Sequence, residues 1–293
     1  MDPQEIGIVT PFGRFAAQRW GPPQGDPTIA VHGWLDNSAS FDPLAPLLPE
    51  IHLLALDLAG HGHSDHKPPA TAYHLVDHVR DVLAVADALA WQRFGLLGHS
   101  LGAAIAALVA GTFPQRITRL VLIEGLGPIA GEASELPVNL ARAIEEQLEG
   151  RKEPNPVYAS IDEVAAARQR AGDMSFEAAR TLVTRALGSC EGGVTWRSDP
   201  RVRLSSPQRF TEAQVRAFLC RINAPTLSVL GEEGMLATKY PQMLQRASCL
   251  ADSEVAWLPG GHHLHMDHPQ QVAAVIEDFL LRHRLGNASS PNR

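Results

Sequence analysis

Short apolar runs that alternate with helix-like segments constrain the fold of this chain more than any other feature. Residues 28–31 and 51–56 are nearly all apolar at both odd and even positions, which is typical of strands buried on both faces. Similar runs follow at 93–97, 120–123, 225–230 and 255–258. Strands of this kind belong to parallel sheets covered by helices on each side. The sequence therefore predicts an α/β fold with a doubly wound, mostly parallel sheet.

The segments between these runs carry apolar residues at helical spacing. Residues 73–91 place Leu75, Val79, Val82 and Leu89 three, four or seven positions apart, which predicts an amphipathic helix. Residues 101–112 and 269–283 predict two further helices. The last residues, 287–293, are expected to be a frayed tail.

The alternation stops between residues 125 and 211. This stretch shows helix patterns at 138–149, 161–170 and 175–187, and no buried-strand pattern. A further helix is predicted at 211–221, with Thr211 as its N-cap. We therefore predict a core made of residues 1–124 and 212–293, with a helical cap, residues 125–211, inserted between strands 6 and 7 of the sheet.

Charge and composition exclude several classes of protein. The chain has 25 basic and 32 acidic side chains and a net charge of −7, which argues against nucleic-acid or membrane partners and favours a small-molecule substrate. The three cysteines are widely spaced and suggest neither disulfides nor a zinc knuckle. The longest apolar run is too short to span a bilayer, and the acidic N-terminus lacks the features of a secretory signal, so a cytoplasmic location is expected.

A Gly-x-Ser-x-Gly motif stands between a predicted strand and a predicted helix. It reads Gly98-His99-Ser100-Leu101-Gly102. A serine in such a sharp turn needs minimal side chains two positions before and after it, and the helix behind it supplies main-chain donors to a developing oxyanion. Ser100 is therefore expected to be a nucleophile. The alternative is an ordinary glycine-rich turn.

A nucleophilic serine needs a general base, and residues 260–269 offer candidates. This loop follows the last strand and so lies at the carboxyl edge of the sheet, where ligands of open α/β sheets bind. The motif and the loop together resemble the α/β-hydrolase family, whose pattern is a glycine-preceded histidine, an acid five positions later and a proline after one further residue. His262, Asp267 and Pro269 match this spacing. The resemblance implies that His262 is the base.

The resemblance also implies where the oxyanion donors and the acid lie. The donors would be the main-chain N–H groups of Trp34, in the loop after strand 28–31, and Leu101. Most of the family carries its acid at the position of Gly234 here, so the acid is expected at Glu124, directly after strand 120–123, as in a known variant. Glu233 is the fallback acid and Glu232 a weaker one. Glu124 could instead be a hydrogen-bonded structural carboxylate.

Two other segments carry weaker resemblances. Residues 57–64 resemble the D-x-x-G-x-G-x-S loop of the family, which is structural in most members. Residues 196–201, leading into Ser206-Pro207, look similar to the serine hydrolase-like branch of the family. Four histidines at 262, 263, 265 and 268 raise the alternative of a metal site, but their spacing lacks the regularity of zinc ligands, so no metal and no cofactor is expected.

These features predict a serine hydrolase that cleaves carboxylic esters or thioesters through an acyl-enzyme. Ser100 would attack, His262 would carry the proton, and Glu124 would orient the imidazole. Two alternatives stay open. The same residues could perform other chemistry, such as C–C bond hydrolysis or perhydrolysis, or the scaffold could bind a ligand without catalysis.

Overall fold

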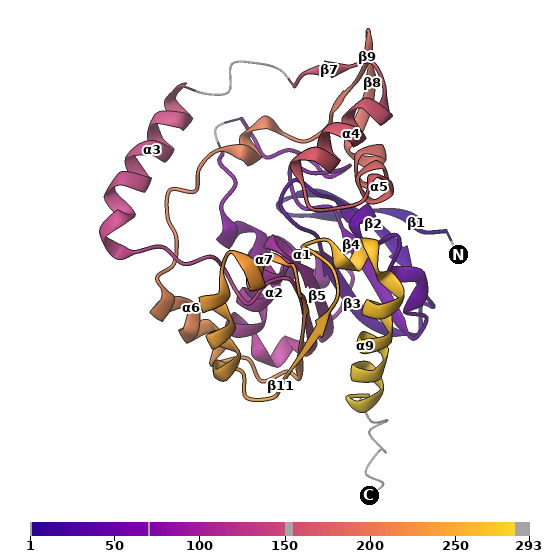
Figure 1. Cartoon of the computed structure of the whole chain (residues 1–293), viewed down its shortest axis with the longest axis vertical. Helices are drawn as coiled ribbons and strands as arrows, with labels where there is room; N and C mark the ends of the chain where they lie inside the picture. The colour runs from indigo at the N-terminus through magenta and orange to yellow at the C-terminus, as the bar shows by residue number, and fades with distance from the viewer. Residues whose placement is uncertain (1, 70, 150–154, 285–293) are drawn as a thin grey trace, which may run out of the picture.

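The computed structural model describes residues 2–69, 71–149 and 155–284 (Figure 1). Its main sheet has eight strands in the order β1-β2-β4-β3-β5-β6-β10-β11. The bounds are β1 (Gln4–Thr10), β2 (Gly13–Trp20), β3 (Asp26–Val31), β4 (Ile51–Leu56), β5 (Phe94–His99), β6 (Ile117–Ile123), β10 (Thr226–Gly231) and β11 (Ser253–Leu258). From β4 to β11 all neighbours are parallel, which confirms the predicted fold class. The expected frayed tail at 287–293 lies outside the described residues.

The first two strands were not predicted from the sequence. β1 pairs with β2, and β2 with β4, in antiparallel fashion at one edge of the sheet. β1 is an edge strand whose burial is confined to residues such as Ile8, while Gln4, Glu5, Gly7 and Val9 are exposed. A search for continuous apolar runs misses such a half-exposed strand, because only every second side chain needs to be apolar.

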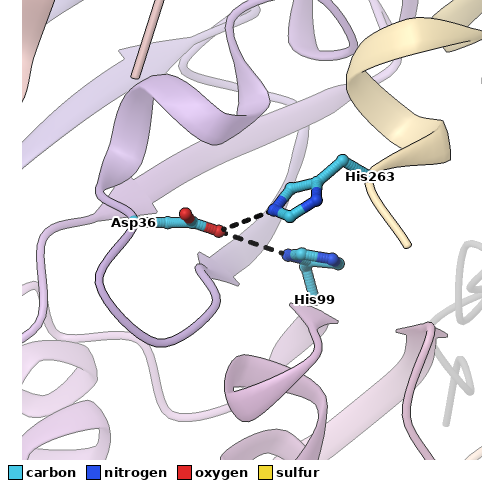
Figure 2. Close-up of side chains that lie close together, drawn as sticks. All are labelled: Asp36, His99 and His263. Carbon is cyan, nitrogen blue, oxygen red and sulfur yellow. Dashed lines mark ion pairs between the residues drawn. The ribbon is translucent and has the colours of Figure 1, made fainter. Parts of the chain in front are cut away.

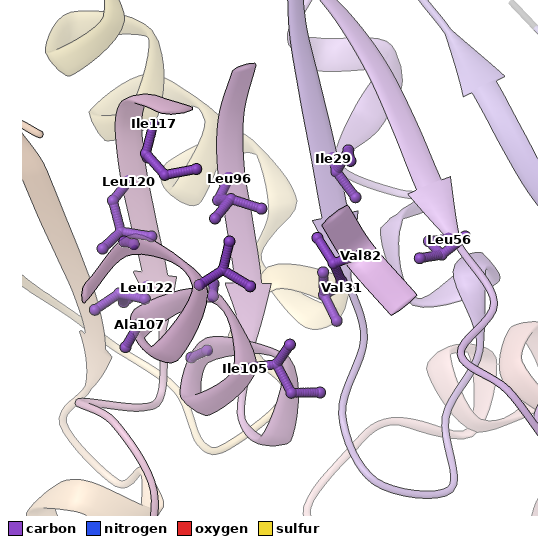
Figure 3. Close-up of a cluster of buried hydrophobic side chains, with 14 of the residues drawn as sticks. Ile29, Val31, Leu56, Val82, Leu96, Ile105, Ala107, Ile117, Leu120 and Leu122 are labelled. Carbon is purple, nitrogen blue, oxygen red and sulfur yellow. The ribbon is translucent and has the colours of Figure 1, made fainter. Parts of the chain in front are cut away.

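Helices cover both faces of the sheet. α1 (Leu75–Ala88), α2 (Leu101–Thr112) and α6 (Glu212–Leu219) pack on one face, and α9 (Pro269–Arg282) packs on the other. Figure 3 shows the first of these cores, with Leu120 and Leu122 of β6 beside residues of α2. The intervening side chains of β6 face the second core. Full burial of each such side chain contributes roughly 1.5–3 kcal/mol. No helix within the described ranges is both long and apolar enough to cross a membrane.

The segment between β6 and β10 contains the predicted helices and also a small sheet. The helices are α3 (Leu136–Glu149), α4 (Ile161–Ala171) and α5 (Phe176–Ala186), and the sheet has the order β7-β9-β8, made of Val157–Tyr158, Gly193–Trp196 and Leu187–Cys190. The prediction of helices alone was therefore incomplete. The strands are two to four residues long and mostly half-exposed, too short to give a clear pattern. Gly193, with φ +146°, permits the close pairing, since a Cβ there would lie 2.0 Å from the Tyr158 carbonyl oxygen.

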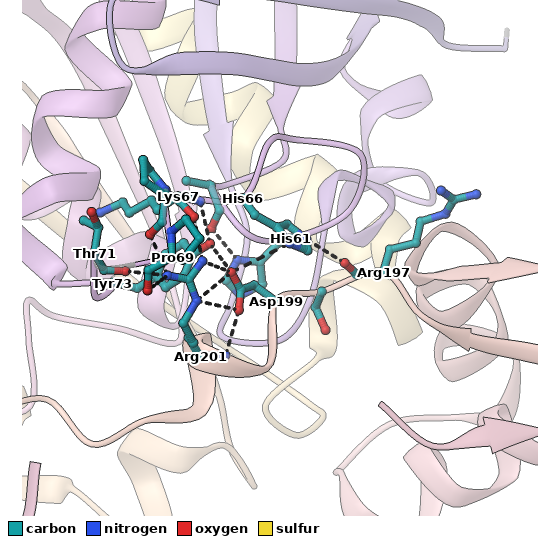
Figure 4. A network of polar contacts seen from close by, with 12 residues as sticks. His61, His66, Lys67, Pro69, Thr71, Tyr73, Arg197, Asp199 and Arg201 are labelled. Carbon is teal, nitrogen blue, oxygen red and sulfur yellow. Dashed lines mark hydrogen bonds and ion pairs between the residues drawn. The ribbon is translucent and has the colours of Figure 1, made fainter. Parts of the chain in front are cut away.

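The end of this inserted segment is fastened to the loop that follows β4 (Figure 4). The Arg201 guanidinium donates hydrogen bonds to four main-chain carbonyls, those of Lys67, Pro68, Pro69 and Thr71. It also pairs with Asp199, which accepts a hydrogen bond from the Tyr73 hydroxyl at 2.8 Å. The segment at 196–201, noted in the sequence for its resemblance, thus holds the insertion against the core.

Candidate active site

Ser100 lies in the turn between β5 and α2, where the sequence placed it. Its backbone is in the left-handed region, with φ +52° and ψ −111°. The flanking glycines are required, since a Cβ on Gly98 would lie 2.4 Å from the Gly102 carbonyl oxygen, and one on Gly102 would lie 1.8 Å from the Val31 carbonyl oxygen. The tight packing of α2 on β3 therefore forces the serine into a strained turn that presents its Oγ at the sheet edge.

His262 joins Ser100 to Glu124. Its Nε2 lies 2.9 Å from Ser100 Oγ, and its Nδ1 lies 3.3 Å from Glu124 Oε2. Because an ionised carboxylate only accepts hydrogen bonds, Nδ1 carries the proton, and Nε2 is left to accept from the serine hydroxyl. This is the tautomer that a general base acting on Ser100 needs. The structure thus brings together three residues that are far apart in the sequence.

Glu124 is completely buried and held at both oxygens. It follows β6 directly, with φ +51°, and its Oε1 and Oε2 accept hydrogen bonds from the main-chain N–H groups of Gly231 at 2.9 Å and Met235 at 2.7 Å. Met235 begins α7 (Met235–Thr238). The main-chain donors thus take the place of water around this buried carboxyl group.

The structure explains why position 234 holds glycine. A Cβ on Gly234 would lie 2.2 Å from Glu124 Oε1, so a side chain there and the Glu124 carboxylate cannot occupy the same space. Glu232 and Glu233 are exposed, and no hydrogen bond or ion pair of their side chains occurs among the described residues. The carboxylate that reaches His262 is thus Glu124 and not the fallback candidate.

The two residues expected to supply oxyanion donors lie at the ends of neighbouring strands. Leu101 is the first residue of α2, so its N–H has no partner within the helix. Trp34 lies in the loop after β3, which pairs with β5 in parallel, and it is the second residue of a turn closed by a hydrogen bond from Asp36 N to Gly33 O. The Trp34 side chain is half-exposed, and its indole N–H donates to the Val202 carbonyl at 2.9 Å.

The loop that carries His262 is also held by the inserted segment. Asp173, just after α4, accepts a hydrogen bond from the His262 main-chain N–H at 2.9 Å. A Cβ on Gly261 would lie 1.7 Å from the same carboxylate oxygen, so the loop can come this close to Asp173 only because residue 261 is glycine. Ser175 N donates to Asp267, the acid of the family pattern, at 3.2 Å. Asp173 was not predicted from the sequence, although a charged residue two positions before the helix N-cap Ser175 was a usable signal.

A buried polar group of Asp36, His99 and His263 (Figure 2) neighbours the site, since His99 precedes Ser100 and its ring centroid lies 4.9 Å from that of His262. Asp36 Oδ2 is 3.7 Å from His99 Nδ1 and 3.5 Å from His263 Nε2, while Asp36 Oδ1 accepts from Arg168 of α4 at 2.7 Å. Burial lowers the pKa of His99 to about 4. Burial opposes the charge on Asp36, but His263, His99 and Arg168 hold its pKa well below the usual value. Asp36 and Arg168 were not predicted from the sequence; for Asp36 the available signal was a charge shortly after the buried strand β3.

The histidines at 32 and 61 have structural roles. His32 donates from Nδ1 to the Gly33 carbonyl and accepts from Leu58 N at 3.0 Å through Nε2, which joins the loops after β3 and β4. His61 is buried beside it, donates to the Ala59 carbonyl, and has a pKa lowered by burial to about 3. These hydrogen bonds connect the residues at 57–64 to the loop after β3.

Known proteins share this architecture along most of the chain. The family described as "alpha/beta hydrolase fold" matches residues 27–174. The "Serine hydrolase-like protein" of Danio rerio is 30% identical over 94% of this chain and 88% of that protein, and the "Serine hydrolase-like protein 2" of Homo sapiens is 31% identical over 94% and 93%. A crystal structure of a hypothetical protein from Pseudomonas aeruginosa PAO1 has a TM-score of 0.90 at 46% identity, over 95% of this chain and 99% of that chain. These matches span both the core and the inserted segment.

Proposed function

The chain belongs to the α/β-hydrolase family, and from this premise we propose that it is a serine hydrolase that cleaves carboxylic ester or thioester bonds of a small molecule. The single observation that carries the proposal is the hydrogen-bonded order Ser100 Oγ, His262 imidazole, Glu124 carboxylate, with separations of 2.9 and 3.3 Å. A serine at this position favours acyl transfer over the chemistry of relatives that attack with aspartate.

In this proposal Ser100 Oγ attacks the acyl carbon while His262 Nε2 takes its proton. The resulting imidazolium is stabilised by Glu124, whose orientation is set by the N–H groups of Gly231 and Met235. His262 then passes the proton to the leaving alcohol or thiol, which leaves the acyl group on Ser100. Water, deprotonated by the same histidine, attacks the acyl-enzyme and releases the acid.

The tetrahedral intermediates carry negative charge on the former carbonyl oxygen. We assign the stabilising donors to the main-chain N–H groups of Trp34 and Leu101, the second of which also carries the positive end of the α2 dipole. Each such donor contributes about 3 kcal/mol to transition-state stabilisation in comparable sites. Main-chain donors are favoured because they need no reorganisation during the reaction.

We assign residues 125–211 the role of a cap over the site. The support is that α5 packs against Met266, in the short helix α8 (Leu264–Asp267) of the His262 loop, and that Asp173 holds the main chain of His262. A cap of this kind would exclude water from the acyl-enzyme and select the substrate by its shape.

The decisive experiment is covalent labelling. Purified protein is treated with a fluorophosphonate probe and analysed by intact mass, beside Ser100→Ala. The proposal expects one adduct that the variant lacks. Well-folded protein that takes no label, or a variant that labels equally, contradicts it and favours a ligand-binding role.

Two further variants test the acid, and a substrate panel tests the bond that is cleaved. Glu124→Gln should lower kcat by about 10⁴-fold, as expected for loss of the residue that fixes the imidazole tautomer. Glu233→Gln is the matched control and should change kcat less than about 2-fold, because its side chain is exposed. Short- and medium-chain p-nitrophenyl esters and acyl thioesters form the panel. Labelling of Ser100 without turnover of any of them would contradict the ester assignment and favour other chemistry by the same residues.

A further inference from the structure

The buried group Asp36, His99 and His263 has the composition of a metal site and no role in the proposed acyl transfer. One oxygen of Asp36 and one nitrogen of each histidine lie within 4.8 Å of one another, and all three residues are buried. They come from three segments: the loop after β3, the end of β5 and the loop after β11 (Figure 2). The histidine at 263 belongs to the cluster whose spacing alone gave no reason to expect a metal.

Hydrogen bonds determine which nitrogen of each ring faces the group. His99 Nε2 lies 2.9 Å from the His262 carbonyl, and His263 Nδ1 lies 3.2 Å from the Asp173 carbonyl. A carbonyl only accepts, so these two nitrogens carry protons, and His99 Nδ1 and His263 Nε2 are the ring nitrogens that face Asp36 and are available as metal ligands. Metal-binding histidines characteristically donate their other ring N–H to a carbonyl or carboxylate in this way.

The two separations that involve Asp36 are closer to those between metal ligands than to those between hydrogen-bonded partners. The separations of 3.7 and 3.5 Å from Asp36 Oδ2 to the two nitrogens are long for hydrogen bonds. In a tetrahedral zinc site with bonds of about 2.0–2.1 Å, neighbouring ligand atoms are about 3.3–3.4 Å apart. Among the described residues, the fully buried His99 Nδ1 has no hydrogen-bond partner. A buried nitrogen lone pair without a partner is costly, and a cation between these atoms would remove that cost.

We propose that Asp36, His99 and His263 bind one divalent transition-metal ion of the Zn²⁺ class. Imidazole nitrogen and carboxylate oxygen are ligands that suit Zn²⁺, and a water molecule would complete a tetrahedral set. Arg168 occupies the other oxygen of Asp36 and orients the carboxylate. The ion would join three segments behind the site, since His99 precedes Ser100 and His263 follows His262, and it would stabilise the folded chain rather than take part in acyl transfer.

Zinc binding is measured on the full-length protein after removal of any metal-affinity purification tag and treatment with a chelator. We expect one Zn²⁺ per chain by calorimetry and by elemental analysis after dialysis, and a higher Tm with Zn²⁺ present. Asp36→Asn and His263→Gln keep the size of each side chain and should bind Zn²⁺ at least about 100-fold more weakly. His268→Gln, in the same loop but outside the group, is the matched control and should bind as the parent does.

Co²⁺ provides a direct readout of the ligands. Intense visible absorption of tetrahedral Co²⁺, absent from His263→Gln, supports the site. A spectrum of octahedral Co²⁺, a thiolate-to-cobalt band, or binding by Asp36→Asn and His263→Gln that is as tight as that of the parent protein overturns the proposal. The same measurements on Ser100→Ala should match the parent protein, so the outcome does not depend on whether the chain is an active hydrolase.

Discussion

The two parts of the inserted segment are attached to the core in different ways. α4 and α5 bury apolar side chains such as Val164, Leu182 and Val183 and send Arg168 and Arg185 into the core. In α3, by contrast, Ala143 is the buried residue of the helix, and apolar side chains at 138, 140, 144 and 148 are exposed. Figure 1 shows α3 standing apart from the sheet, whereas α4 and α5 lie close to it.

This difference indicates which part of the insertion is built into the site. The α4–α5 part contacts the loops that carry Asp36, Asp57 and His262, so its displacement would disturb groups around Ser100. α3 has few buried apolar contacts, and elements of that kind open at a low free-energy cost. We therefore expect substitutions in the two parts to have very different consequences.

The largest effect is expected at Arg185. Its guanidinium donates to both oxygens of Asp57, which is fully buried, and also pairs with Glu5. Arg185→Leu would leave the Asp57 carboxylate buried without its cation and should lower the free energy of unfolding by about 3–5 kcal/mol. Arg142→Leu, on exposed α3, should change it by less than about 0.5 kcal/mol. Urea titration measures the free energy of unfolding of both variants. Equal losses would contradict the expected difference between α5 and α3.

The second largest effect is expected at Asp173 and concerns catalysis. Asp173→Ala removes the acceptor for the His262 main-chain N–H. A small displacement of the imidazole should lower kcat for ester hydrolysis by about 10- to 100-fold, with a smaller change in KM. Asp162→Ala, on the exposed face of α4, is the control and should leave kcat within about 2-fold. An unchanged kcat in Asp173→Ala would show that α4 does not position His262.

A third effect is the pH dependence of the Arg185 variant. Burial alone would raise the pKa of Asp57, but Arg185 and the main-chain donors of His63 and Ser38 hold it below 3.8. The interaction between Arg185 and ionised Asp57 therefore stabilises the wild-type protein above pH 3.8. This stabilisation is lost as the pH falls through the lowered pKa of Asp57. Without Arg185 the pKa rises, and protonation relieves the buried charge at higher pH.

The stability difference between wild type and Arg185→Leu should therefore shrink as the pH falls from 7 toward 3.8. Thermal unfolding at a series of pH values measures this difference. A difference that stays constant over the series would mean that Asp57 is not the group responsible.

The smallest effect is expected at Leu148 of α3, which is 82% exposed. Leu148→Ala should change the free energy of unfolding by less than about 0.5 kcal/mol. Leu182→Ala in α5 is the matched substitution at a buried position, and it should cost about 2–5 kcal/mol because it leaves a cavity. A large loss in Leu148→Ala would show that α3 is packed against a surface that the chain alone does not reveal.

The order of strands and helices was predictable to within a few residues for most elements. The strand at 51–56 and the helix at 101–112 have the predicted bounds, because their patterns depend on local periodicity. Ser100 was recognisable for a similar reason, since the glycines two positions before and after it are needed to avoid clashes with neighbouring backbone atoms. The half-exposed β1 and the small sheet around Gly193 gave weaker patterns and were missed.

Local sequence thus determined most of the helices and strands, the serine turn and the loop of His262, because each depends on contacts between residues a few positions apart. It did not determine which carboxylate would reach His262, nor that Asp36, His99 and His263 would meet behind it. Parallel strands bring their carboxyl ends to one edge whatever the separation along the chain, and only the folded packing then decides which side chains occupy that space. The clearest case is Gly234, whose missing side chain leaves room for Glu124.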